Sequence, residues 1–137
     1  MRKVIVLLLF SIFIFNGFSR TLSQKDLIQP NAKLVQIADS FVFTEGPTCN
    51  KRGDIYFTDI YTSRIYKWTV DREILTVRDP SGRANGLQFD KEDNLLACEG
   101  ATRCVTSTST DGKVTILASH YNGKKLNSPN DLWIDPK

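Results

Sequence analysis

Three polar side chains with oxygen donors recur along the chain, each close to the start of a strand-like run. Glu45 precedes a Gly-Pro pair, Asn85 precedes a Gly-Leu pair, and Asn130 follows a Ser-Pro pair. The intervals between them are 40 and 45 residues. If the fold brought these positions together, one carboxylate and two amides would make a hard, oxygen-rich site. Calcium, magnesium and manganese prefer such ligands, so the chemistry indicated is that of a divalent cation.

The elements that would position these side chains are short β-strands. Runs rich in β-branched and aromatic residues alternate with polar turns, and Asp111-Gly112 predicts a tight hairpin. Two groups of four such runs are followed by the opening of a third, and no long helical periodicity follows the N-terminal segment. The predicted strands are residues 40–47, 55–59, 64–70 and 73–77, then 85–90, 95–98, 104–108 and 113–117, and finally 128–135.

A repeat of about 40–50 residues built of short strands is typical of a β-propeller. The fold class predicted for residues 41–137 is therefore all-β, with about two blades and one further strand of a propeller. The first strand of each blade lines the central channel, which would bring Glu45, Asn85 and Asn130 together. Closure takes about four to eight blades. We therefore expect these residues to be an incomplete part of a longer protein, or to self-associate through exposed blade edges.

The first 40 residues follow a different pattern. Residues 1–19 combine Arg2-Lys3 with the apolar run Val4–Phe15, which is typical of a secretory signal peptide. The run is short for a membrane span of about 20 apolar residues, so cleavage is favoured over a retained anchor, and no stable membrane anchor is expected after cleavage. The mature chain is then exported, either periplasmic or secreted. Residues 20–40 form a polar lead-in, in which Leu34–Ile37 alternates as a strand would.

Composition limits the partners and the redox chemistry. The net charge is +3 and no basic run is longer than Lys124-Lys125, so nucleic acid is not an expected partner. Cys49, Cys98 and Cys104 are an odd number for an exported protein. Cys98 and Cys104 flank a turn and could form a disulfide across a hairpin; alternatively, all three cysteines are small buried residues. No Cys or His spacing in the sequence predicts a zinc site.

Three motifs stand in order at the blade spacing. They are Thr44-Glu45-Gly46-Pro47 with Gly53–Asp59 after it, then Ala84-Asn85-Gly86-Leu87, then Gly123–Leu132, which contains Asn127-Ser128-Pro129-Asn130-Asp131. Together they resemble the gluconolactonase–regucalcin (senescence marker protein-like) family, and above all its bacterial gluconolactonase branch. The likeness runs from about Phe41 to the end and spans less than half of a typical member. It implies a six-bladed propeller that holds one divalent metal, often calcium, in its channel and hydrolyses lactones such as glucono-1,5-lactone.

The resemblance also implies roles for particular residues. Glu45 matches the first metal ligand of the family, and Asn130 matches an amide at the channel mouth that contacts the substrate or a metal-bound water. The other ligands, an Asn and an Asp of later blades, would lie beyond Lys137, and that Asp is the expected catalytic base. Some members carry an Arg two residues before the Asn130 position, where this chain has Ser128, so the resemblance implies no cationic contact to the substrate here.

Two further residues are weaker candidates for the site. Asn85 stands at the equivalent position of the intervening blade, but an Asn before Gly86 also fits a turn. Glu99 ends a predicted strand that could face the channel rim. His120, the only histidine, lies among polar loop residues and is interpreted as a surface residue.

The function predicted is metal-dependent hydrolysis of a sugar lactone to the open-chain acid. The expected cofactor is one divalent cation, calcium first, with magnesium, manganese or zinc as alternatives. Such a cation polarises the carbonyl and acidifies a bound water. Because the chain holds one strong ligand, we expect it to be inactive alone. The alternative is an exported propeller that binds sugar or protein at its channel mouth without chemistry. A propeller esterase acting on aryl or organophosphate esters is a third hypothesis, against which the Ser-Pro-Asn-Asp motif argues.

Overall fold

The computed structural model describes residues 28–135, and the chain divides into two units, Met1–Ile37 and Ala38–Lys137. In the first unit, residues 28–37 form no helix or strand. The strand predicted over Leu34–Ile37 is therefore wrong, because no neighbouring strand pairs with this segment in the described part of the chain. The signal peptide predicted for residues 1–19 lies outside the described residues. Between residues 28 and 135, no helix is long and apolar enough to cross a membrane.

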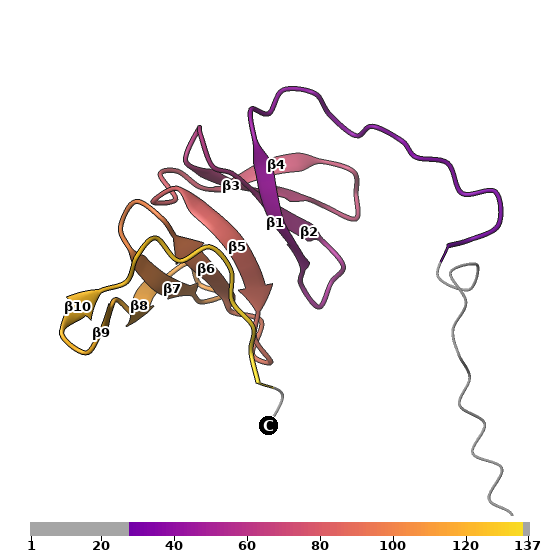
Figure 1. Cartoon of the computed structure of the whole chain (residues 1–137). Coiled ribbons are helices and arrows are strands. Elements are labelled where there is room, and N and C mark those ends of the chain that lie inside the picture. The colour runs from indigo at the N-terminus through magenta and orange to yellow at the C-terminus, as the bar shows by residue number, and fades with distance from the viewer. Residues whose placement is uncertain (1–27, 136–137) are drawn as a thin grey trace, which may run out of the picture. The chain divides into compact units, whose positions relative to one another are not determined.

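The second unit contains two four-stranded antiparallel sheets, in which neighbouring strands follow one another along the chain (Figure 1). The first sheet consists of β1 (Thr44–Cys49), β2 (Ile55–Asp59), β3 (Arg64–Trp68) and β4 (Ile74–Arg78). The second consists of β5 (Ala84–Phe89), β6 (Leu95–Glu99), β7 (Cys104–Thr108) and β8 (Val114–Ala118). A small hairpin of β9 (His120–Tyr121) and β10 (Lys124–Lys125) follows. The eight strands predicted for two blades are therefore confirmed.

The two sheets repeat one another at a constant interval of 40 residues. Thr44 of β1 lies opposite Asp59 of β2, and Ala84 of β5 lies opposite Glu99 of β6. The other strands keep the same interval, so each sheet is one copy of a single four-stranded unit. A sequential antiparallel sheet of four strands is a propeller blade, and the predicted all-β, partial-propeller fold is confirmed.

A β-bulge interrupts the first strand of each sheet near its start. The register shifts between Glu45 and Thr48 in β1 and between Ala84 and Leu87 in β5. The prediction that the first strand ends at Gly46-Pro47 is wrong, since β1 continues to Cys49. The bulge accommodates Gly46 at a φ of 53° together with a proline that has no N–H to donate.

The core lies between the two sheets and is formed by their inner strands. Ile65 of the first sheet packs with four residues of the second, namely Ala84, Leu87, Leu95 and Ala97. The rings of Tyr56 and Phe89 meet edge to face across the same boundary, with centroids 4.8 Å apart. Burying one such Leu or Ile stabilises the fold by about 2 kcal/mol. The outer strands β4 and β8 remain exposed, so this packing holds the inner strands most firmly.

The segment after β10 runs beside β5 without becoming a strand (Figure 1). Gly86 N donates to Asn130 O at 2.8 Å. The strand predicted over residues 128–135 is nevertheless wrong, because one backbone hydrogen bond does not make a ladder. Trp133 of this segment is 74% exposed.

The three cysteines are free. Cys98 lies opposite Val105, and Cys104 lies opposite Glu99. Side chains alternate along a strand, so the two cysteines of this hairpin point to opposite faces and form no disulfide. Cys98 and Cys104 are buried, as the alternative predicted, whereas Cys49 is exposed. Burial raises the pKa of the Cys98 thiol to about 11, which keeps it protonated and inert.

Candidate functional site

The buried carboxylate of Asp59 anchors the entry into β1 and so helps to position Glu45. Asp59 Oδ2 accepts the N–H of Val42 at 3.0 Å, and Oδ1 accepts the N–H of Phe43 at 3.2 Å. Burial raises the pKa of Asp59, but the hydrogen bonds from these two amides outweigh it, and the pKa lies below its ordinary value. A charged Asp59 therefore holds the backbone immediately before Glu45.

Close backbone contacts hold the starts of successive repeats side by side. Thr58 Oγ1 donates to the carbonyl oxygen of Asn85 at 3.2 Å, and a Cβ at Gly46 would collide with that same carbonyl. Gly86 has the equivalent relation to the third repeat, since a Cβ there would lie 2.8 Å from Asn130 O. Glycine at these two positions permits the approach, so the three repeats meet where their first strands begin.

Glu45, Asn85 and Asn130 line one hollow of about 400 Å³. Glu45 and Asn130 are exposed and Asn85 is half-buried. Within residues 28–135, none of the three side chains has a hydrogen-bond or ion-pair partner. The fold thus gathers the three predicted side chains and leaves one carboxylate and two amides free for a ligand. Sequence reasoning missed Gln88 in the same wall, whose buried Oε1 has no partner in the described residues.

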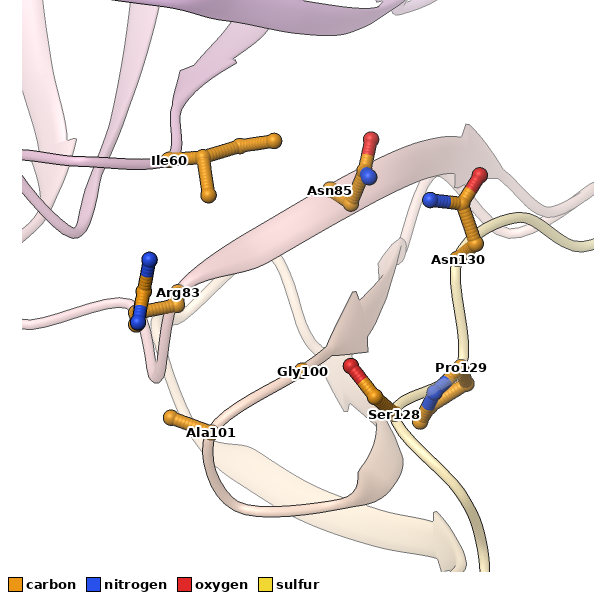
Figure 2. Close-up of a pocket in the computed structure, with 8 residues that line it drawn as sticks. All are labelled: Ile60, Arg83, Asn85, Gly100, Ala101, Ser128, Pro129 and Asn130. Carbon is orange, nitrogen blue, oxygen red and sulfur yellow. The ribbon is translucent and has the colours of Figure 1, made fainter.

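A second hollow, of about 250 Å³, adjoins the first and shares Asn85 and Asn130 with it (Figure 2). Its wall is formed by residues from four loop segments and the start of β5, namely Ile60, Arg83, Asn85, Gly100, Ala101, Ser128, Pro129 and Asn130. Arg83 was missed by the sequence analysis. It stands two residues before Asn85, as Ser128 stands two before Asn130, and the two share a positive φ of 55° and 51°. That spacing was the signal that could have identified it.

The structure gives Glu99 a role in the fold. Its side chain is 3% exposed and lies 2.6 Å from Arg78 Nη2. Thr102 and Thr106 donate to it at 2.6 and 2.7 Å. Burial raises its pKa, but the threonine hydroxyls and Arg78 outweigh this and lower it below the ordinary value. The expectation that Glu99 faces the channel rim is wrong, because its oxygens are committed to this buried network and it is absent from the walls of both hollows.

Asp131 and His120 are less available as site residues. Asp131 lines the first hollow, but its Oδ1 accepts the N–H of Leu132 at 2.9 Å and lies against Gly86. His120 is exposed, with its Nδ1 2.9 Å from Ser119 Oγ, which confirms the surface position predicted for it.

The donor set limits which metals this region could hold. No cluster of three His, Cys, Asp or Glu side chains suited to a metal occurs among the described residues. Glu45 with two amide oxygens fits a hard cation such as calcium, which takes about six to eight oxygen ligands. These three side chains would suit such a cation but would fill only part of its coordination shell.

Two four-stranded blades that meet where their first strands begin define the chain as part of a β-propeller protein. A model of the SMP-30/Gluconolactonase/LRE-like region matches residues 43–137, and the chain belongs to that family.

Relatives of known structure and name agree with this assignment. The chain is 27% identical over 112 residues to a gluconolactonase of Zymomonas mobilis subsp. mobilis (strain ATCC 31821 / ZM4 / CP4). A solved structure named as a gluconolactonase is 33% identical with a TM-score of 0.70, over 74% of this chain. A gluconolactonase from Xanthomonas campestris, described as important in glucose secondary metabolic pathways, is 30% identical with a TM-score of 0.70, over 73% of this chain.

The chain spans about a third of these relatives. The share is 32% of the Zymomonas protein and 36% and 34% of the two solved chains. A virginiamycin B lyase from Staphylococcus aureus shares the fold alone, at 17% identity and a TM-score of 0.53 over 64% of this chain and 30% of its own.

Proposed function

We propose that this chain forms part of a metal-dependent lactonase that opens a sugar lactone to the acid. The observation that carries the proposal is the meeting of Glu45, Asn85 and Asn130 in one hollow, each without a partner in the described residues. Unpartnered polar groups in a concave site are available to a ligand. The chain spans about a third of its relatives. We therefore assign the activity to the complete propeller, whose site these residues would help to form.

Glu45 is the residue to which we assign the metal. It contributes a free carboxylate, and Asn85 can add an amide oxygen from the adjoining repeat. Bound there, a divalent cation would supply a Lewis acid for the lactone carbonyl. Calcium suits an oxygen-only donor set best, with magnesium, manganese and zinc as alternatives.

Asn130 is the residue to which we assign substrate contact. Asn130 lines both hollows, and Figure 2 shows its amide at the second. An amide offers both donor and acceptor atoms, which suits the hydroxyl groups of a sugar lactone. Its backbone carbonyl is held by Gly86 N at 2.8 Å, so the side chain projects from a fixed point.

We assign the general base to no residue of this chain. Glu45 would be engaged by the cation, and Asp131 is hydrogen-bonded to Leu132 N. With one strong metal ligand and no free base in the walls of the two hollows, we expect this chain to show no lactone hydrolysis above the uncatalysed rate. Hydrolysis by the chain would contradict that expectation.

The experiment that tests the site is calorimetric titration of calcium into the purified chain, with Glu45→Gln as the test variant. We expect binding that disappears in Glu45→Gln, because the carboxylate is the only charged donor of the three. Glu92→Gln is the matched control, since Glu92 is an exposed carboxylate in the turn between β5 and β6. Equal calcium binding by wild type and Glu45→Gln would overturn the assignment of the metal.

A binding protein without catalysis is the second candidate, favoured by the lack of a free base in the two hollows described. The two candidates separate on one comparison. A lactonase site should hydrolyse glucono-1,5-lactone once the rest of the propeller is present, whereas a binding site would hold the lactone or its acid unchanged.

The export proposal rests on residues 1–19 and has its own test. Expression with the native N-terminus should yield a protein that starts after about Ser19 and leaves the cytoplasm. Mass measurement of an intact N-terminus in the cytoplasmic fraction would contradict it.

A further inference from the structure

We propose that Arg83 forms a subsite for an anionic group, a carboxylate or a phosphate, carried by the lactone at the channel mouth. This inference rests on the proposed function, because it names the substrate class of the same site. The expected substrate is a sugar lactone with a negatively charged substituent.

Arg83 is held rigidly at the wall of the second hollow. Its N–H donates to Ser63 Oγ at 2.9 Å, and its carbonyl accepts the N–H of Gly100 at 3.2 Å. Its guanidinium carbon lies 5.9 Å from the centre of the Tyr61 ring, a distance at which a cation is attracted to the ring face. The backbone is thus fixed on both sides and the side chain rests on an aromatic surface, so little order has to be gained when a ligand binds.

The guanidinium of Arg83 is free to bind a ligand. It has no carboxylate partner in the part of the chain that the structure describes, whereas Arg64 pairs with Asp79 at 2.7 Å and Arg78 pairs with Glu99 at 2.6 Å. The planar fork of an arginine side chain matches a carboxylate or a phosphate through two parallel hydrogen bonds. An anion is therefore the ligand that this group would take.

The hollow around Arg83 suits a small anionic molecule. Arg83 and the amides of Asn85 and Asn130 line the same space of about 250 Å³ (Figure 2). None of the eight residues in its wall is acidic, so nothing there repels a negative charge. An anionic substituent on Arg83 would leave the rest of the molecule against the two amides, which also line the hollow that contains Glu45.

The charge distribution of the loops points the same way. Loops at the site end of the two blades carry four cationic side chains and one carboxylate; they are residues 60–63, 79–83, 100–103 and 119–127. Turns at the opposite end carry five cationic side chains and seven carboxylates; they are residues 50–54, 69–73, 90–94 and 109–113. The loops at the site end are positive on balance, which favours an anion at Arg83, although Glu45 and Asp131 of the adjoining hollow offset part of that charge.

Equilibrium binding of two sugar acids tests the subsite without requiring catalysis. D-glucarate carries a carboxylate at both ends, and D-gluconate at one. We expect the purified chain to prefer glucarate, and Arg83→Gln to weaken glucarate binding by about five- to tenfold, the loss typical of one charge-assisted contact at a partly exposed site. Arg72→Gln is the matched control, because Arg72 is an exposed arginine at a φ of 67° in a turn at the opposite end.

Several outcomes would overturn the subsite. They are no measurable glucarate binding, equal affinity for the two acids in the wild type, or the same loss in Arg83→Gln and Arg72→Gln. If Arg83→Gln unfolds, Arg83→Lys keeps the charge without the fork, and an unchanged glucarate affinity in that variant would contradict bidentate binding.

The failure of the subsite and that of the lactonase proposal are distinguishable. Calcium binding that depends on Glu45, combined with no preference for glucarate, would retain the metal site and remove the subsite. Glucarate binding that depends on Arg83, without any calcium binding, would retain the subsite and remove the metal-dependent lactonase.

Discussion

The two blades have the same strand arrangement, but they carry different side chains at the end that lines the hollow. Glu45 and Asn85 occupy the same position, 40 residues apart; Glu45 lies directly before the bulge of β1, and Asn85 lies within the bulge of β5. One is a carboxylate and the other an amide, and neither has a partner in the described part of the protein. Within residues 28–135, neither side chain supports the fold through a hydrogen bond or an ion pair, which agrees with the proposal that both positions face a ligand.

The far ends of the blades show the opposite behaviour. In the first blade Asn50 Oδ1 accepts the N–H of Asp54 at 2.9 Å, and in the second Asp90 Oδ1 accepts the N–H of Asn94 at 2.8 Å. The residue types are exchanged, yet the side chains of both pairs remain hydrogen-bonded, at 3.2 and 2.8 Å. At this end the hydrogen bonds are preserved because they support the turns.

Acid is expected to have the largest effect, because it acts on both blades together. Five described carboxyl groups have pKa values below their ordinary range: Asp54, Asp59, Asp90, Glu99 and Asp111. The unfolded chain therefore binds more protons, so stability is full above about pH 5 and falls as the pH drops through the lowered values, below about pH 4. The urea midpoint measured from pH 7 to pH 2 checks this. Glu99→Gln should reduce the pH dependence of the urea midpoint more than Asp111→Asn does, since Asp111 is exposed. An equal reduction in both variants would contradict the role given to Glu99.

Removal of the Glu99 carboxylate should produce the largest loss from a single substitution. Glu99→Ala leaves Arg78, Thr102 and Thr106 without their shared acceptor, and breaking one side of a buried ion pair costs about 3–5 kcal/mol. Thermal unfolding measures the loss. A matched Glu92→Ala in an exposed turn should be nearly neutral, and a loss for Glu99→Ala below about 1 kcal/mol would show that the network contributes little.

Gly46→Ala tests how closely the first two repeats must approach. The new Cβ meets the Asn85 carbonyl, and the backbone at position 46 has a φ of 53°. We expect a loss of about 2–4 kcal/mol in unfolding free energy. Gly112→Ala is the control, because that glycine also has a positive φ, 85°, but nothing lies within 4 Å of the Cβ position. Equal losses would assign the whole effect to the backbone conformation.

Exchange of Asn50 and Asp54 tests whether the turns at the far ends of the two blades are equivalent. Asn50→Asp alone places two carboxylates opposite each other and should cost about 1–2 kcal/mol. Adding Asp54→Asn recreates the order found in the second blade and should restore stability to within about 0.5 kcal/mol. A double-mutant cycle by urea unfolding measures the coupling. Additive effects of the two changes would contradict the equivalence.

The smallest change in stability is expected at the positions that differ most between the blades. Glu45→Gln and Asn85→Asp should each alter the unfolding free energy by less than about 0.5 kcal/mol, because neither side chain has a partner to lose. Asn85→Asp should strengthen calcium binding by adding a second carboxylate, while Glu45→Gln abolishes it. A stability loss above about 1 kcal/mol for either variant would indicate a structural role.

Local sequence patterns were sufficient to predict eight strands, the blade repeat and the three side chains that share a hollow. Alternation of apolar and polar residues, turn residues and a 40-residue interval are all properties of neighbouring positions, and a repeated unit places equivalent positions equivalently. Leu34–Ile37 and residues 128–135 were predicted as strands for the same reason, and wrongly. A strand exists only when a second strand pairs with it, and no local pattern reports the partner.

The residues that the sequence could not place depend on contacts between repeats. The burial of Glu99 beside Arg78, and the position of Arg83 over Tyr61 next to two amides, each join residues that lie about 20 positions apart. From sequence alone, the Gly-Pro pair in β1 predicts a strand end. The structure shows a bulge there instead, because the carbonyl of Asn85 approaches Gly46 closely. Short-range sequence periodicity thus determines the strands of each blade, whereas the proposed ligand-binding surface forms where one blade packs against the next.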